Sequence, residues 1–291
     1  MQTSDETTSH DHLKSGDLLN DLHHNGKLLV LPNIWDPLSA SLLERLGYPA
    51  VATASASIAF SNGYPDGEKF PFPELLNVLQ RIVRMVKIPV TADIETGYAN
   101  NKRRLSENIK KLVATGIAGI NIEDSSADGD SLLSINAQCE KISLIKKTAL
   151  AMGTTLFINA RTDIYLKAGH LPGEEKLAAT AQRGNAYKDA GADGFYPIFL
   201  KTKEDIENIV KAVALPVNIL LLPGIPDFVT LQKAGVARIS LGPGFLNIAI
   251  NAMKNTAARL LLYGGMDEVK QNPVTMDYLN SLISGKTPGT K

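Results

Sequence analysis

The sequence has very little cysteine and no excess of charge. Cys139 is the single cysteine among 291 residues, and 30 basic residues balance 30 acidic ones. One cysteine excludes a disulfide within the chain and a metal cluster held by several thiolates, and it fits a reducing cytoplasm. Balanced charge gives no electrostatic footprint for nucleic acid or for an anionic membrane surface. We therefore expect the partner to be a small molecule.

Long apolar runs are also missing. No stretch reaches the roughly 18 apolar residues that a membrane-spanning helix requires. The amino terminus, MQTSDETTSHDHLKSGD, lacks the basic start and the apolar stretch of a signal peptide. We expect residues 1–20 to form a flexible segment in solvent and the protein to be cytoplasmic.

The sequence does contain one repeated pattern: a short apolar strand, a turn, an amphipathic helix and a break of small residues. The helix ends RLGYPAV, ATGIAGI, DAGADGF and KAGVARI each place glycine after a helix, where a left-handed conformation is favoured. Eight strands are predicted, at residues 27–34, 50–55, 89–95, 119–124, 155–161, 194–198, 216–221 and 238–242. Helices are predicted at residues 37–46, 73–86, 103–115, 137–152, 174–190, 203–213, 226–234 and 244–263.

Eight alternations predict an α/β fold, a (β/α)8 TIM barrel over residues 21–263, because right-handed crossovers can close a parallel sheet at this number. The alternative is an open doubly wound sheet, which is disfavoured because no glycine-rich dinucleotide fingerprint follows the first strand. Residues 264–291 are predicted to be a helical extension containing the amphipathic segment MDYLNSLI. This extension either packs against a neighbouring subunit or docks on its own barrel.

Acidic residues occur where two predicted strands end: Asp93 and Glu95 on the third strand, and Glu123 and Asp124 on the fourth. The carboxyl ends of barrel strands meet at one rim, so these acids require a compensating cation. Oxygen ligands favour a hard ion such as Mg²⁺, with Mn²⁺ as the alternative, and no histidine falls at a predicted strand end to suggest zinc. For Asp93, Glu95 and Glu123 together we favour a metal site. For Asp124 we favour helix capping or pairing with an arginine.

Arg161 ends the predicted strand LFINAR, and a guanidinium in a buried strand requires an anionic partner. The partner is Glu123 or Asp163, or else the carboxylate of a substrate, and the sequence leaves these alternatives open. A Schiff-base aldolase is disfavoured because it requires a lysine near a strand end inside the barrel.

Five segments, NIWDPLSASLLERLGYPAV, GYPDG, TADIETGY, INIEDS and INARTD, resemble the isocitrate lyase and phosphoenolpyruvate mutase superfamily in order and spacing. The resemblance covers roughly residues 27–250. It implies a Mg²⁺-dependent barrel that acts on a small 2-oxo or 2-hydroxy carboxylic acid. The shared chemistry is stabilisation of an enolate or related oxyanion as a carbon–carbon or carbon–phosphorus bond breaks. The resemblance also implies a homo-oligomer, a dimer or a tetramer, that exchanges terminal helices between subunits.

The resemblance also implies roles for individual residues. By matching position, Asp93 is the main metal ligand, whereas Glu95, Glu123 and Asp66 act largely through metal-bound waters. Arg161 contacts the substrate carboxylate and forms the catalytic group with Asp66 and Glu123. Three further residues are implied to line the substrate pocket: Trp35, Ser55 and Ser57.

The sequence also departs from that family. Its lyases carry a Lys-[Lys/Arg]-Cys-Gly-His motif after the fourth strand, where this chain reads SSADGDSLLSIN. Cys139 comes later and is predicted to be a buried, inert thiol on the next helix. Ile198 stands near the place of the lyase glutamate after the sixth strand. The leading hypothesis is a lyase, mutase or hydrolase with altered specificity groups, and the alternative is a catalytically silent barrel that binds a small carboxylate as a sensor or scaffold.

Overall fold

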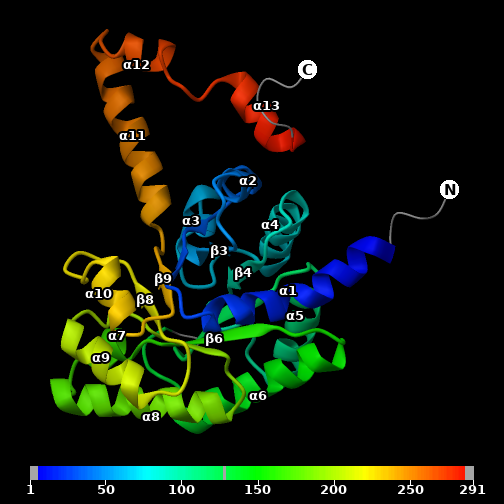
Figure 1. Ribbon diagram of the computed structural model, residues 1–291, viewed down its shortest axis with the longest axis vertical. Coiled ribbons are helices and arrows are strands. Elements are labelled where there is room, and N and C mark those ends of the chain that lie inside the picture. The colour runs from blue at the N-terminus through cyan, green and yellow to red at the C-terminus, as the bar shows by residue number, and fades with distance from the viewer. Residues whose placement is uncertain (1–5, 127–128, 286–291) are drawn as a thin grey trace.

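The computed structural model describes residues 6–126 and 129–285, with side chains from residue 15 onward. Parallel strands form two ladders within this part of the chain, in the orders β2-β3-β4-β5-β6-β7 and β1-β9-β8 (Figure 1). The strands are β1 (Leu29–Leu31), β2 (Asn33–Ile34), β3 (Val51–Thr53), β4 (Val90–Asp93), β5 (Gly119–Glu123), β6 (Phe157–Thr162), β7 (Gly194–Pro197), β8 (Asn218–Leu220) and β9 (Arg238–Ser240).

The two ladders join into one closed barrel. A parallel bridge between Phe195 and Val217 links β7 to β8. At the other junction the predicted first strand is split around Pro32, and β1 pairs with β9 whereas β2 pairs with β3. Proline has no N–H to donate, so the strand breaks at Pro32. The segment before the break pairs with β9, and the segment after it pairs with β3. The predicted (β/α)8 barrel is confirmed, and the open sheet is excluded.

The predicted helices are also confirmed, with shifts of a few residues at their ends. Helix α2, for example, begins after Asp36, whose carboxylate accepts a hydrogen bond of 2.7 Å from the backbone N–H of Ser39. The helices are α1 (Glu6–His24), α2 (Pro37–Arg45), α3 (Ser55–Ser61), α4 (Phe72–Met85), α5 (Lys102–Val113), α6 (Ile135–Ala151), α7 (Ile164–Lys167), α8 (Gly173–Asp189), α9 (Lys203–Ala212), α10 (Phe228–Lys233), α11 (Gly244–Leu261), α12 (Met266–Lys270) and α13 (Met276–Ser284).

The apolar core lies between the strands and the surrounding helices, whereas the barrel interior is unusually polar. Inside the barrel, Asn159 donates to Asn121 at 2.9 Å and Asn218 donates to Ser240 at 3.0 Å. Arg238 at the start of β9 is fully buried. Barrels of this class usually fill their interior with branched apolar side chains, so this barrel is built to hold polar groups.

The amino-terminal segment, expected to be flexible over residues 1–20, is helical where the structure describes it, and residues 1–5 lie outside the described part of the chain. Helix α1 extends through most of residues 1–20, and its Leu19 is fully buried. A side chain at Gly16 would place its Cβ 1.8 Å from the carbonyl oxygen of Thr155, so only glycine permits this close approach. His23 then stacks on Phe157 with ring centroids 4.1 Å apart. The helix therefore packs over the amino-terminal ends of the strands, opposite the predicted site.

We call residues 244–270, which contain α11 and α12, the carboxyl-terminal arm. Helix α11 stands away from the barrel and carries α12 at its far end (Figure 1). Helix α13 returns to α2, where Leu282 is buried and its carbonyl oxygen accepts a 2.7 Å hydrogen bond from Ser41. The extension thus docks α13 on its own barrel, one of the two predicted arrangements. No helix in the described ranges is long and apolar enough to cross a membrane.

Candidate active site

Strands β4, β5 and β6 deliver the predicted residues to one rim of the barrel. The ladder pairs Asp93 with Asn121, Glu123 with Arg161, and Arg161 with Tyr196. Residues paired in a parallel ladder project to the same side of the sheet, so their side chains are neighbours. The carboxyl ends of the strands therefore gather acids around one arginine, as the sequence predicts.

Asp93 is held by two side-chain hydroxyls. Its Oδ2 accepts a 3.1 Å hydrogen bond from Ser55, and its backbone N–H donates to Thr53 Oγ1 at 3.1 Å. Burial raises the pKa of its carboxyl, the charge of Arg161 opposes that shift, and the charge of Asp66 adds to it. A cation near Asp93 would relieve this cost.

Glu95 is a buried carboxyl in a strained backbone position, with φ of 51°. Its Oε2 accepts a hydrogen bond of 2.5 Å from the backbone N–H of Glu68, and its Oε1 accepts one of 3.1 Å from the Tyr98 hydroxyl. Burial, followed by repulsion from Asp93 and Asp66, raises the pKa of Glu95 to about 8. The two hydrogen bonds fix where this carboxyl points.

Arg161 is paired on both sides. Its Nη1 lies 3.0 Å from Glu123 Oε2, and its Nε and Nη2 donate to the two oxygens of Asp163 at 2.6 and 3.1 Å. Burial by itself would lower the pKa of Arg161, but Glu123, Asp163 and Asp93 raise it above its ordinary range. Burial raises the pKa of Glu123 to about 8 despite the arginine. The sequence left Glu123 and Asp163 as alternative partners of Arg161, and the structure pairs it with both; a substrate contact is left as a proposal.

Asp124 has the structural role that the sequence favoured. Its Oδ2 accepts hydrogen bonds from Arg183 at 3.0 Å and from the Tyr187 hydroxyl at 2.6 Å. Its Oδ1 accepts the backbone N–H of Asp163 at 2.9 Å. Asp124 therefore ties α8 to the loop after β6 and positions the aspartate that holds Arg161.

The remaining predicted residues are only partly brought together. Asp66 is exposed in the loop between α3 and α4, near enough for its charge to raise the pKa of Asp93 and Glu95. Trp35 is half-buried against the core. Ser57 is fully buried in α3, and its Oγ has no hydrogen-bond partner among the described residues. Direct hydrogen bonds thus link Ser55, but neither Trp35 nor Ser57, to the acids.

Two further residues at the rim escaped prediction. Tyr196 on β7 is nearly fully buried beside Arg161, and burial raises the pKa of its phenol. Lys141 on α6 donates to the carbonyl oxygens of Thr96 at 3.2 Å and Glu123 at 3.4 Å. Strand alternation in GFYP could have indicated Tyr196, but no local signal marks a helix lysine that reaches across to two loops.

The oxygen donors at the rim fit Mg²⁺, an ion that does not require a closed cage of protein ligands. Within the described ranges, no three histidine, cysteine or acidic side chains lie in a cluster that could hold one ion. Mg²⁺ usually takes one or two carboxylates and keeps several waters, so it needs no such cluster. The donors are all oxygen, and burial, with repulsion between the acids added to it, raises the pKa of each carboxyl, a cost that a cation would relieve. Asp93 would hold the ion directly, and Glu95 and Glu123 would do so through waters.

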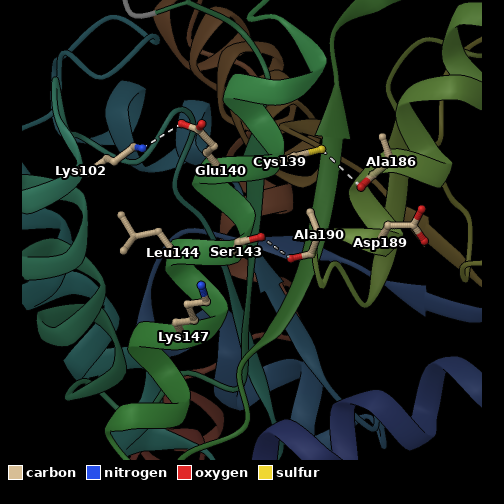
Figure 2. Close-up of a pocket in the computed structure, with 9 residues that line it drawn as sticks. All are labelled: Lys102, Cys139, Glu140, Ser143, Leu144, Lys147, Ala186, Asp189 and Ala190. Carbon is tan, nitrogen blue, oxygen red and sulfur yellow. Dashed lines mark hydrogen bonds and ion pairs between the residues drawn. The ribbon is translucent and has the colours of Figure 1, made fainter.

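A groove of about 620 Å³ on the outer face of the barrel offers a contrast to the rim. Figure 2 shows it between α6 and α8, with Lys102 reaching Glu140 at 2.9 Å. The Cys139 thiol on α6 donates to the Ala186 carbonyl at 3.3 Å, and burial raises its pKa. The prediction that this cysteine lies on the helix is confirmed, although it is half-buried. Cys139, Ser143 and Lys102 are thus already bonded to neighbouring groups, and the groove, among the residues described, lacks the grouping of buried acids that marks the rim.

Comparisons with known proteins agree with this geometry. An uncharacterised protein of Mycobacterium tuberculosis is 34% identical over 77% of this chain and 81% of its own length. The phosphonopyruvate hydrolase of a Variovorax species is 26% identical over 84% of this chain and 86% of its own. A solved Burkholderia cenocepacia structure, described as a candidate phosphonomutase, is 35% identical with a TM-score of 0.80, over 87% of this chain and all of that one.

The family assignment follows from the length of chain that matches. The model of the phosphoenolpyruvate phosphomutase family matches residues 19–261, which include the closed barrel and every residue at the rim. Named relatives in this group include lyases, mutases and hydrolases of small carboxylates. With its parallel barrel and its paired acids at the strand ends, this chain belongs to the phosphoenolpyruvate phosphomutase family.

Proposed function

We propose that this protein is a Mg²⁺-dependent enzyme that breaks or rearranges a carbon–carbon or phosphorus–carbon bond in a small 2-oxo or 2-hydroxy carboxylic acid. The observation that carries the proposal is the grouping of Asp93, Glu95 and Glu123 at one rim, with Asp93 and Glu123 beside the paired guanidinium of Arg161. Membership of a family of lyases, mutases and hydrolases supports the same class of chemistry.

The residues at the rim have distinct parts in this proposal. Bound Mg²⁺ would polarise the substrate oxygens that become negative as the bond breaks. Arg161 is held between Glu123 and Asp163, so its positive charge is already in position for the substrate carboxylate and for the developing oxyanion. The ordinary pKa of a phenol, about 10, already keeps Tyr196 protonated at neutral pH, and burial raises that pKa further, so Tyr196 supplies a neutral hydrogen-bond donor beside Arg161.

The proton that ends such a reaction comes from a group other than the usual cysteine. The loop after β5 contains neither cysteine nor histidine, and Cys139 bonds to a carbonyl on the outer helical layer. Water or a group of the substrate would then supply the proton. A barrel that only binds a carboxylate would also lack the cysteine, so turnover has to be measured directly.

The test is release of pyruvate from oxaloacetate, phosphonopyruvate and 2-methylisocitrate, with Mg²⁺ or with EDTA. Asp93→Asn should abolish both turnover and Mg²⁺ binding measured by calorimetry. Glu140→Gln, in the outer groove, is the control and should change neither. Mg²⁺ binding without turnover would favour the silent, carboxylate-binding barrel, and unchanged Mg²⁺ affinity in Asp93→Asn would overturn the metal assignment.

We also propose that the protein forms a homo-oligomer through the carboxyl-terminal arm. Leu246 is the buried residue of α11, whereas Leu261 is 81% exposed and Tyr263 is 99% exposed. Exposed apolar surface of this kind marks a protein interface. Light scattering should therefore report a dimer or a tetramer, and Leu261→Asp combined with Tyr263→Asp should shift the protein to monomer. A wild-type monomer at tens of micromolar would refute the proposal.

A further inference from the structure

Glu68 connects two loops at the rim, one before α4 and one after β4. One of its side-chain oxygens, Oε1, accepts hydrogen bonds from the backbone N–H of Thr96 at 3.0 Å, the Thr96 hydroxyl at 2.6 Å and the backbone N–H of Tyr98 at 2.7 Å. Its own backbone N–H donates to Glu95 Oε2 at 2.5 Å. The side chain of Glu68 therefore holds the backbone that follows Glu95, and its backbone N–H holds the Glu95 carboxyl.

The hydrogen bonds of Glu68 also join three residues whose backbone is strained. Glu68, Glu95 and Tyr98 have positive φ angles of 57°, 51° and 53°, a region that favours glycine. Such conformations persist when surrounding contacts hold them, and they collect at functional sites. The three strained residues touch one another through the hydrogen bonds of Glu68 and Glu95, so one set of contacts holds all three.

The Glu68 carboxylate lies among other acids and is held there by hydrogen bonds. Its Oε1 accepts three hydrogen bonds from Thr96 and Tyr98, and among the described residues no other side chain links these groups to the backbone N–H that holds the Glu95 carboxyl. A carboxylate next to other carboxylates is tolerable where it accepts several hydrogen bonds and where a cation balances the group. The hydrogen bonds of Glu68 therefore give Glu95 a fixed orientation.

We infer that Glu68 is a positioning residue, which sets the orientation of Glu95 and thereby the affinity of the rim for Mg²⁺. This inference rests on the proposed function, because it assumes that the rim holds the ion. Glu68 acts through Glu95 and Tyr98 and is not itself assigned as a ligand. Outer residues that orient metal ligands commonly change metal affinity by about 10- to 100-fold when they are replaced.

The chain offers a matched control at the opposite end of the barrel. Glu44 also ties a loop through one side-chain oxygen, which accepts the backbone N–H of Lys87 at 2.6 Å and of Ile88 at 3.2 Å. These residues precede β4, whereas the rim follows it. Glu44→Ala therefore removes a similar loop contact without touching Glu95.

The experiment measures Mg²⁺ affinity by calorimetry on the full chain, together with urea denaturation and hydrogen exchange of the amides at residues 95–98. We expect Glu68→Ala to weaken Mg²⁺ binding by about tenfold or more and to speed exchange in that loop. Glu44→Ala should leave Mg²⁺ affinity unchanged. Glu68→Gln retains an oxygen that can accept the three hydrogen bonds, so its affinity should stay within about threefold of the wild type.

Two further variants keep each outcome decisive. Glu68→Asp retains the charge but is one methylene shorter, so it should weaken Mg²⁺ binding as Glu68→Ala does even if the alanine variant folds poorly. The inference about Glu68 would be overturned if Glu68→Ala and Glu68→Asp bound Mg²⁺ as tightly as the wild type and Asp93→Asn did not bind it. If Asp93→Asn also bound Mg²⁺ normally, the proposed metal site would fail instead. Loss of affinity in Glu68→Gln equal to that in Glu68→Ala would identify the charge, and not the positioning, as the cause.

Discussion

The rim of the barrel and the carboxyl-terminal arm depart from the ordinary distribution of residues in opposite directions. At the rim, charged groups are buried: Glu95 is 5% exposed and Asp163 is 2% exposed. On the arm, large apolar side chains such as Leu261 and Tyr263 lie in solvent. Buried charge and exposed apolar surface are the two informative exceptions to normal burial. Buried charge costs stability, whereas exposed apolar surface favours association with another surface, and each indicates what is missing from the isolated chain.

The two regions also differ in how far other groups of the same chain compensate for these exceptions. Arg161 neutralises part of the charge at the rim, and three carboxyl groups there still have raised pKa values. On the arm, α13 leaves α11 and packs against α2 instead. The rim therefore lacks a small cation, whereas the arm lacks a second apolar surface to pack against. Substitutions in the two regions should reveal this difference.

Arg161→Met should have the largest effect, because it leaves the buried Glu123 and Asp163 without their cation. Removing one partner of a buried pair costs about 3–5 kcal/mol in the free energy of unfolding. Urea denaturation should show this loss, together with loss of turnover. The matched variant is Lys146→Met, whose 2.7 Å pair with Asp193 is about one-quarter exposed on each side. It should cost at most about 1 kcal/mol, and equal losses in the two variants would refute the distinction.

The stability of the metal-free protein should fall as pH rises. Glu95 and Glu123 have pKa values of about 8 in the folded chain, against an ordinary value of 4.5. Their contribution to stability is therefore greatest below about pH 4.5 and is lost as pH rises through 8, by at most about 1.4 kcal/mol per pH unit for each group. Urea denaturation in EDTA at pH 6 and 8 measures this slope. Mg²⁺ should stabilise more at pH 8, and a reversed slope for these carboxyls would contradict the assignment.

Asp93→Asn should separate stability from function. The change removes a charge that raises the pKa of Glu95, so the metal-free protein should gain about 1 kcal/mol at pH 8. Turnover and Mg²⁺ binding should be lost in the same variant, as is common where a strained site is relaxed. Thermal unfolding with and without Mg²⁺ checks both effects. A variant that is less stable in EDTA would show that repulsion at the rim is unimportant.

Substitutions on the arm should change assembly more than folding. Leu261→Ser combined with Leu262→Ser should alter the free energy of unfolding of a dilute monomer by no more than about 0.5 kcal/mol, because both side chains are already in solvent. The concentration dependence of the melting temperature should decrease, since it reports linkage to assembly. A large loss of stability in the monomer would mean that the arm packs within its own chain.

Cys139→Ser should have the smallest effect. The thiol donates to the Ala186 carbonyl from the outer helical layer, and a serine hydroxyl can make the same contact. We expect a change below about 1 kcal/mol in stability and unchanged turnover. Strong inactivation, or inactivation by a thiol reagent that the serine variant resists, would show that this cysteine reaches the chemistry.

The elements that the sequence predicted well have strong local signals. The strands ending at Asp93 and Glu123 are short, mostly apolar runs bounded by turns, as expected where both faces of a strand are buried. Helix α1 was missed because residues 1–20 are mostly polar, and what holds the helix is the close approach of Gly16 to Thr155. Glu68 and Lys141 were missed for a related reason: their partners lie on other loops, about 28 and 45 residues away in the sequence.

The sequence by itself determined the alternation of strands and helices, the acids at the strand ends and the family resemblance, because period, turn chemistry and residue order are local properties. Only the tertiary structure decided how those acids are used. It assigned Asp124 to Arg183 and Tyr187, paired Arg161 with Glu123 and Asp163, and fixed Glu95 between Glu68 and Tyr98. Hydrogen bonds and raised pKa values depend on distance and burial, and both exist only once the barrel has closed.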